Sequence, residues 1–131
     1  MTVELLALLG LTGILFLSIM AQALALDVQA GIGHTLSPRD APHPTPTPLT
    51  GRLDRNVANQ VEGLLLFAPL VVVASATATS NEWTQGAAVL YLAMRALYVP
   101  SYLFAWVPFR SLFWGIGLLA LGAFVWGLLG A

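Results

Sequence analysis

The apolar and polar positions divide the chain into four long apolar stretches, separated by two short polar breaks and one long polar segment. Residues 3–26 form an apolar stretch in which Glu4 is the single charged residue. At about 1.5 Å of rise per residue, a helix of this length crosses a hydrocarbon core of about 30 Å. Further apolar stretches cover residues 55–79, 83–106 and 109–130. The pattern predicts an all-α membrane protein, with four transmembrane helices in an up-down bundle and a single domain over residues 1–131.

The long polar segment covers residues 27–54 and carries His, Thr, Ser and Asp among five prolines, which are Pro38, Pro42, Pro44, Pro46 and Pro48. Proline lacks a backbone donor and favours extended conformations. This segment is therefore predicted to be a surface loop without helix. The two shorter breaks are a turn at Asn81 and Glu82 and an interruption around Pro108.

The composition supports the membrane assignment and excludes several classes of protein. Apolar residues make up 58% of the chain and charged residues 8%, against about 25% charged in soluble domains. A formal net charge of −1 gives no electrostatic footprint for nucleic acid. The absence of cysteine excludes disulfides, thiolate metal sites and a cysteine nucleophile. Any thiol chemistry therefore requires a sulfur that arrives on a ligand.

A cleaved signal peptide is the alternative for the first stretch, because Ala21, Ala23 and Ala25 resemble a cleavage site. A signal peptide begins with a positively charged region. This chain has Glu4 there and no basic side chain, so we interpret the stretch as a transmembrane helix.

The arginines predict the orientation in the membrane, because basic residues concentrate in cytoplasmic loops. Arg39 and Arg52 lie in the first loop and Arg110 in the third, while neither terminus carries one. Both termini are therefore expected to face away from the cytoplasm.

Small residues recur three or four positions apart along the predicted spans, as Gly10 with Gly13, Ala74 with Ala78, and Ala123 with Gly127. Such spacing allows helices to approach closely. These close contacts could form within one chain or between chains, and the sequence does not distinguish the two possibilities.

A first polar stripe opens the second span, in the segment R-L-D-R-N-V-A-N-Q-V-E. Its members Arg52, Arg55, Asn59 and Glu62 are spaced by 3, 4 and 3 residues and so share one helical face. From Arg55 to Glu62 the stripe climbs about 10 Å toward the membrane interior. A carboxylate is thus held inside the hydrocarbon zone.

A second polar stripe follows on the third span, where Arg95, Tyr98 and Tyr102 lie at i, i+3 and i+7. An arginine in the middle of a span costs about 2.5 to 3.5 kcal/mol and needs a partner. If the hairpin turns at Asn81 and Glu82, then Arg95 starts about 9 Å deeper than Glu62, within reach of its long side chain. One interpretation is therefore a purely structural pair between Glu62 and Arg95.

That pair leaves other polar residues unexplained, namely Arg52, Arg55, Asn59, Tyr98, Tyr102 and Arg110. Their convergence at the cytoplasmic side indicates a hydrophilic cavity. Guanidinium groups bind carboxylates, and Glu62 offers a site for an ammonium. A small anion with one positive end fits this charge pattern; glutathione is such a molecule, and other anions match too.

These segments resemble the superfamily of membrane-associated proteins in eicosanoid and glutathione metabolism, called MAPEG. The resemblance covers nearly the whole chain. It is carried by R-L-D-R-N-V-A-N-Q-V-E at 52–62, S-P-R-D at 37–40, R-A-L-Y-V-P-S-Y at 95–102 and P-F-R-S at 108–111. The resemblance implies four-helix membrane proteins that assemble as homotrimers, with glutathione bound between neighbouring subunits near the cytoplasmic helix ends.

Residue by residue, the resemblance implies a glutathione site. Arg55, Asn59 and Glu62 would face the peptide with Arg52 at the rim, and the third helix would add Arg95, Tyr98 and Tyr102. Arg110 stands where the family's thiol-activating arginine stands, and Ser111 beside it resembles a hydroxyl donor of some members. The thiolate would attack a lipophilic electrophile that enters from the membrane lipids.

The chain departs from the family pattern after the glutamate. Gly63 stands where Tyr or Asn is usual, and Leu65 stands where a proline is expected. The long proline-rich loop is similar to that of the bacterial branch, which implies an inner-membrane location.

Two hypotheses about function follow. The first is a glutathione-dependent transferase or peroxidase that acts on lipophilic electrophiles. The second is a non-catalytic scaffold or accessory subunit that keeps the fold. A metal site at His34, Asp40 and His43 is not expected, because these residues lack the regular spacing of ligands.

Overall fold

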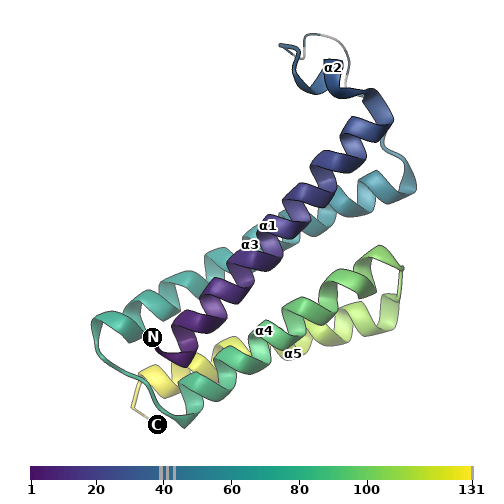
Figure 1. Cartoon of the computed structure of the whole chain (residues 1–131). Coiled ribbons are helices and arrows are strands. Elements are labelled where there is room, and N and C mark those ends of the chain that lie inside the picture. Colours follow the sequence, from purple (N-terminus) through teal and green to yellow (C-terminus); the bar gives the residue numbers. More distant parts are fainter. Residues whose placement is uncertain (39, 41, 43, 131) are drawn as a thin grey trace.

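The computed structural model describes residues 1–38, 40, 42 and 44–130, and this part of the chain is helical without any strand. Four long helices, α1 (Val3–Ala30), α3 (Pro48–Ala76), α4 (Glu82–Leu103) and α5 (Val107–Leu128), are joined by loops and by the single turn α2 (Ile32–Thr35) (Figure 1). The predicted all-α class is confirmed.

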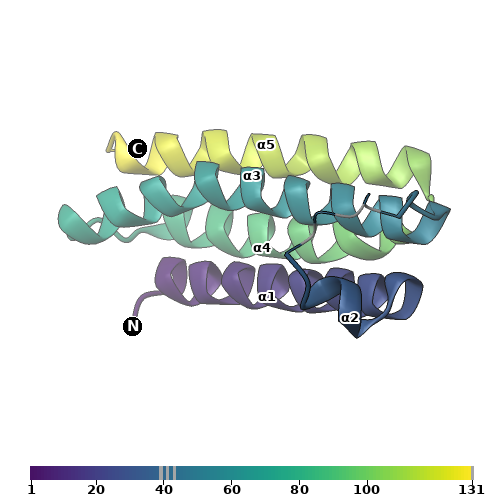
Figure 2. The same ribbon diagram turned by 90° about the horizontal axis from the view of Figure 1, so that it is seen from above.

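Helix α1 lies beside α3, and α4 lies beside α5, with both chain termini at one end of the molecule (Figures 1 and 2). The connection from α4 to α5 and the segment around α2 lie at the opposite end. That end carries the arginines at the start of α3 and of α5.

Three of the four long helices, α1, α3 and α5, are long and apolar enough to cross a membrane. These three helices fit a multi-pass integral membrane protein. Helix α4 forms where the third span was predicted, but it is not among these three, and its 22 residues include Glu82 and Arg95. Many large apolar side chains of the bundle point outward, including Phe16, Val72 and Leu119, as expected for helices surrounded by lipid or by other subunits.

The predicted loop at 27–54 is wrong at both ends. Helix α1 continues to Ala30 and ends at Gly31, whose φ of 85° leaves the helical region. Helix α3 begins at Pro48 rather than at Arg55, because Thr47 and Thr50 cap its first turn reciprocally. Proline is favourable in the first turn of a helix, where its missing N–H has no partner to lose.

The turn predicted at Asn81 and Glu82 begins earlier. Helix α3 ends at Ala76, and Ala78 follows in the left-handed region with a φ of 51°. Asn81 caps α4 by accepting hydrogen bonds from the N–H groups of Trp83 and Thr84. The chain therefore reverses a few residues before the predicted hairpin at 81 and 82. As a result, each residue of α4 lies beside a residue of α3 that comes earlier in the sequence than predicted.

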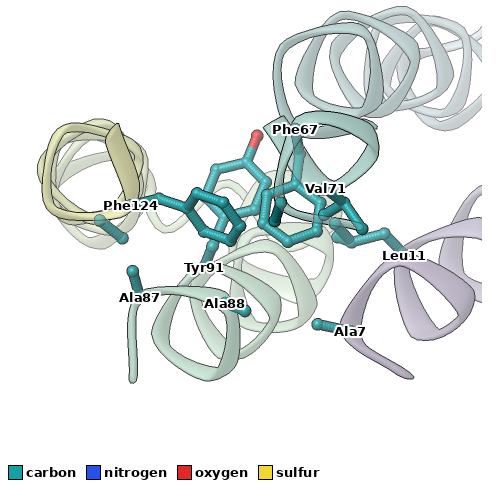
Figure 3. Close-up of a cluster of buried hydrophobic side chains, with 10 residues drawn as sticks. Ala7, Leu11, Phe67, Val71, Ala87, Ala88, Tyr91 and Phe124 are labelled. Carbon is teal, nitrogen blue, oxygen red and sulfur yellow. The ribbon is translucent and has the colours of Figure 1, made fainter. Parts of the chain in front are cut away.

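The apolar core lies where all four long helices meet (Figure 3). The rings of Phe67 and Tyr91 stack with their centroids 5.0 Å apart, and Phe124 packs edge-on against Phe67 at 5.6 Å. The rest of the core consists of Leu11, Val71 and five alanines, among them Ala7, Ala87 and Ala88. The Tyr91 hydroxyl donates a hydrogen bond of 2.9 Å to the carbonyl of Gly63, which joins this core to the polar region beyond it.

Candidate functional site

A polar pocket of about 420 Å³ opens between α3, α4 and α5 on the side away from the chain termini. It is lined by Arg55, Asn59, Glu62, Tyr98, Tyr102, Arg110, Ser111 and Trp114. All but Trp114 are residues singled out from the sequence. The two helical stripes therefore meet, as their spacing predicted, and α5 closes the third side.

Tyr102 lies between two guanidinium groups of this pocket. Arg55 donates a hydrogen bond of 2.8 Å from Nε to the Tyr102 hydroxyl. The Cζ of Arg110 lies over the same ring, 5.0 Å from its centre. A cation over an aromatic face is attracted by the ring's negative π-surface. Tyr102 thus contacts the guanidinium groups of both Arg55 and Arg110, with no carboxylate bonded to either group within the described residues.

Three side chains of the pocket keep unused hydrogen-bonding capacity. Within residues 1–38, 40, 42 and 44–130, no group accepts a hydrogen bond from the guanidinium of Arg110, and none donates one to the carboxylate of Glu62. The Tyr98 hydroxyl likewise makes no hydrogen bond to the described residues, although its ring packs 5.7 Å from that of Tyr102. A guanidinium, a carboxylate and a phenol therefore face the pocket with their polar atoms available.

Arg95 takes a different place from the rest of its stripe. It is 5% exposed, and its Nη2 donates to the backbone carbonyl and the side-chain oxygen of Asn59, both at 2.7 Å, and to Gln60 Oε1 at 3.1 Å. Its Cζ lies 5.0 Å from the ring of Tyr98. It lines a smaller cavity beside the main pocket rather than the pocket itself.

The hydrogen-bonded pair between Glu62 and Arg95 is not formed. The earlier end of α3 places Arg95 beside Asn59 and Gly63, where carbonyl and amide oxygens accept its hydrogen bonds. Glu62 interacts with Arg95 only electrostatically. The carboxylate thus remains at the pocket.

Arg52 also lies outside the pocket. Its Nη1 donates a hydrogen bond of 3.2 Å to the carbonyl of Leu103, the last residue of α4. The end of a helix has unpaired carbonyls and a partial negative charge, so an arginine there is stabilising. Arg52 therefore ties the start of α3 to the end of α4.

The sequence analysis missed a buried polar cluster at the end of the bundle that carries the termini. Glu4 is 1% exposed and accepts hydrogen bonds from Ser80, at 3.0 Å, and from Thr84. A carboxylate within an apolar stretch was the available signal, but its partners lie 76 and 80 residues away in the chain. A second buried contact, from Asn56 to Ser18 at 3.1 Å, links α3 to α1.

The remaining sequence predictions concern the loop between α1 and α3. Arg39 and His43 lie outside the described residues, as do Ala41 and Ala131. Across the part of the chain that the structure does describe, no three His, Asp or Glu side chains gather in a way that would hold a metal ion.

The pocket combines two guanidiniums, one carboxylate, an amide, two phenols and a hydroxyl. Guanidiniums bind carboxylates through paired hydrogen bonds, and a carboxylate binds an ammonium group. A guanidinium close to a bound thiol favours the thiolate and lowers the pKa of that thiol from about 8.5. The arrangement suits a small zwitterionic anion and the activation of its thiol.

Comparison with known proteins gives one family. The model of the MAPEG family matches residues 4–130, which is nearly the whole chain and includes all the pocket residues. No curated protein and no solved structure matches the chain. The matched region holds both polar stripes and the Arg110 and Ser111 step on a set of apolar helices. The chain therefore belongs to the MAPEG family.

Proposed function

We propose that this protein is a glutathione-dependent transferase or peroxidase of the membrane, which acts on lipophilic electrophiles. The observation that carries the proposal is the guanidinium of Arg110, which faces a 420 Å³ pocket beside Tyr102 and makes no hydrogen bond to the described residues. A positive group without a protein acceptor, held in place by an aromatic ring, is suited to an anionic ligand.

In this proposal the pocket binds glutathione by its charged ends. Arg55 binds a carboxylate, Glu62 binds the ammonium, and Asn59 and Tyr98 donate to the peptide. Arg110 stabilises the thiolate, and the Ser111 hydroxyl lies next to it in the chain to donate a hydrogen bond to the sulfur. Arg95 and Arg52, which are bonded to α3 and α4, position the pocket from behind and at its rim.

The transfer step balances with an alkyl or aryl halide as the electrophile. The thiol proton leaves to water, and the thiolate sulfur forms a bond to the carbon that carries the halogen. The carbon–halogen bond breaks, and the halide leaves with its electron pair. A guanidinium lowers the free energy of the thiolate and so raises its fraction near neutral pH.

A homotrimer with glutathione between subunits completes this proposal. The pocket is open on one side, with Arg55, Glu62 and Ser111 exposed on a single chain. A neighbouring subunit would cover these groups and exclude water from the thiolate. The proposal also includes four membrane crossings in a bacterial inner membrane, with both termini away from the cytoplasm. The pocket is then cytoplasmic, because it is lined by the start of α5 and the end of α4, and the termini lie at the opposite end of the bundle.

The second candidate is a non-catalytic scaffold or accessory subunit. It is favoured by Arg95 and Arg52, since both donate to backbone carbonyls and serve the fold in the single chain. Under this alternative, the pocket binds lipid headgroups or nothing.

Titration of the purified protein with glutathione, followed by the ultraviolet absorbance of the thiolate, separates the candidates. Binding at millimolar glutathione with a new thiolate band supports the enzyme. Arg110→Ala is expected to lose the band and most of the conjugation activity while it keeps the oligomeric state. An unchanged activity in that variant, or no glutathione binding by the unmodified protein, would overturn the proposal.

A further inference from the structure

A groove of about 270 Å³ lies between α1, α3 and α4, and it shares no lining residue with the polar pocket. Its walls are mostly aliphatic and include Leu17, Leu53, Val99 and Leu103. Two alanines, Ala21 and Ala96, also line it and add only one methyl group each. The groove is therefore a separate, largely apolar space beside the first helix.

Two polar side chains, Ser18 and Asn56, line the groove among these apolar groups. Both are buried, with exposed fractions of 6% and 1%. The side-chain nitrogen of Asn56 donates a hydrogen bond of 3.1 Å to the hydroxyl oxygen of Ser18. An amide carries a second N–H, and the hydroxyl carries a hydrogen of its own. Within residues 1–38, 40, 42 and 44–130, no group accepts a hydrogen bond from either of these two hydrogens.

The two unused donors lie at a depth where water does not replace the missing acceptor. From Ser18 to Leu26, where the first apolar stretch ends, α1 rises about 12 Å. This depth is inside a hydrocarbon core of about 30 Å. A buried donor without an acceptor is unfavourable there. A ligand that brings an acceptor oxygen to Ser18 and Asn56 removes this cost.

Polarity, depth and size together define the chemical class of the ligand. Apolar walls with a few donors suit an apolar body that carries one acceptor. A charged group is costly at this depth, and the polar groups of membrane lipids lie in the interfacial region outside the hydrocarbon core. A cavity of about 150 Å³ holds a benzene molecule. The groove of about 270 Å³ therefore accommodates a body of one or two rings.

We propose that this groove binds a neutral, lipophilic carbonyl compound of one or two rings, such as an aryl ketone, whose oxygen accepts hydrogen bonds from Ser18 and Asn56. Hereafter we call this space the carbonyl groove. The site is independent of the proposed function, because it contains none of the residues assigned to glutathione.

Photolabelling with benzophenone tests the proposal. Benzophenone is a two-ring ketone, and light makes its carbonyl group attach to neighbouring C–H bonds. The purified protein is irradiated with benzophenone in detergent, and the labelled peptides are identified by mass spectrometry. We expect the label within residues 14–21 and 96–103, which include the residues of α1 and α4 that line the groove. Saturating glutathione should leave this labelling unchanged.

Two results of this experiment would overturn the proposal. The first is that both segments stay unlabelled, as they would if a second copy of the chain or a membrane lipid covered the groove. The second is that glutathione blocks the labelling, because the ketone would then lie in the polar pocket. A protein that takes the label but binds no glutathione would contradict the proposed function and leave the carbonyl groove in place.

A pair of competitors tests the hydrogen bonds to Ser18 and Asn56. Acetophenone and α-methylstyrene have the same shape, but the second has a CH₂ group in place of the carbonyl oxygen. Each is added at equal concentration within the detergent, and the light used is absorbed by benzophenone alone. We expect acetophenone to compete about threefold or more strongly, the effect of one net hydrogen bond. Equal competition would show that the donors do not contact the ligand.

A blocking variant tests the position of the ligand. Ala96 lines the groove and is exposed in the single chain, so Ala96→Phe fills the groove from its open side without entering the core. This variant should lose the label at residues 14–21 and 96–103. Ala93→Phe is the matched control, because Ala93 is exposed on the same helix and does not line the groove. Equal labelling of the two variants would overturn the proposed site.

Discussion

The guanidinium of Arg95 lies directly against the backbone of Gly63, so close that a Cβ there would come within 2.9 Å of Arg95 Cζ and 3.0 Å of Nε. This contact lets the side chain cross from α4 to α3 and donate to the carbonyl of Asn59 at 2.7 Å. A residue that costs several kcal/mol in a membrane is thus satisfied by helix backbone rather than by a carboxylate.

Gly63→Ala is expected to destabilise the protein, because Arg95 must withdraw from α3 and lose hydrogen bonds made by a charged group. Such bonds contribute about 1.5 to 3 kcal/mol each, whereas alanine in place of glycine gains about 1 kcal/mol in a helix. We expect a net loss of about 1 to 2 kcal/mol in the free energy of unfolding. Thermal unfolding in detergent measures it.

The matched control is Gly13→Ala on α1, where an added Cβ meets nothing. It should be neutral or slightly stabilising through helix propensity alone. Equal melting temperatures for the two variants would show that Arg95 moves without cost and that its hydrogen bonds to α3 contribute nothing.

The sequence predicted the face on which the pocket lies more accurately than the partner of each residue on it. Helical spacing brought Arg55, Asn59 and Glu62 together because a helix places i, i+3 and i+4 on one side whatever surrounds it. The partner of Arg95 depended on where α3 ends, and an error of a few residues in the turn changed its neighbour from Glu62 to Asn59.

Contacts between residues far apart in the sequence could not be predicted, because local spacing does not determine them. Nothing local distinguishes Glu4, buried against Ser80 and Thr84, from a carboxylate at a membrane surface. The departure at Gly63 was visible in the sequence, but its consequence required the position of Arg95.

Tyr102 is predicted to serve the pocket in two separable ways. Tyr102→Phe keeps the ring under Arg110 but removes the hydroxyl that accepts from Arg55 at 2.8 Å. Loss of one such hydrogen bond costs about 1 to 3 kcal/mol. If Arg55 binds glutathione, KM for glutathione should rise by about fivefold or more while kcat stays nearly constant.

Tyr102→Leu removes the ring as well and leaves Arg110 without its aromatic support. Here kcat should fall together with the thiolate absorbance of bound glutathione. Steady-state kinetics on both variants decide the matter. A leucine variant that behaves like the phenylalanine variant would mean that the ring does not hold Arg110 in position.

Glu4 is expected to contribute to stability and not to activity. Glu4→Ala removes the acceptor for the hydroxyls of Ser80, which is exposed, and of Thr84, which is buried. An unsatisfied buried polar group costs about 1 to 3 kcal/mol, so the melting temperature should drop by several degrees, about 4 to 8 °C per kcal/mol in a small domain. Glutathione binding should be unchanged, because the cluster lies at the end of the bundle with the termini. A variant with normal stability and lost binding would place Glu4 in the functional machinery.

Gly127 on α5 packs directly against the start of α4. A Cβ at this position would lie 2.8 Å from Trp83 Cβ and 3.0 Å from the backbone nitrogen of Thr84. Neither atom is the flexible end of a side chain, so the helices must separate, and overpacking of this kind costs about 1 to 3 kcal/mol. Gly127→Ala should therefore unfold at lower temperature than the parent protein, with the loss seen in a thermal scan in detergent.

Gly122→Ala on the same helix is the control for this variant, since an added Cβ there meets nothing within 4 Å in the single chain. A small residue at 127 was compatible with contacts within one chain or between chains. If Gly127 serves contacts between chains instead, its substitution by alanine would change the oligomeric state while leaving the unfolding of the monomer unaltered. The packing against Trp83 and Thr84 predicts the reverse, because both partners of Gly127 belong to its own chain.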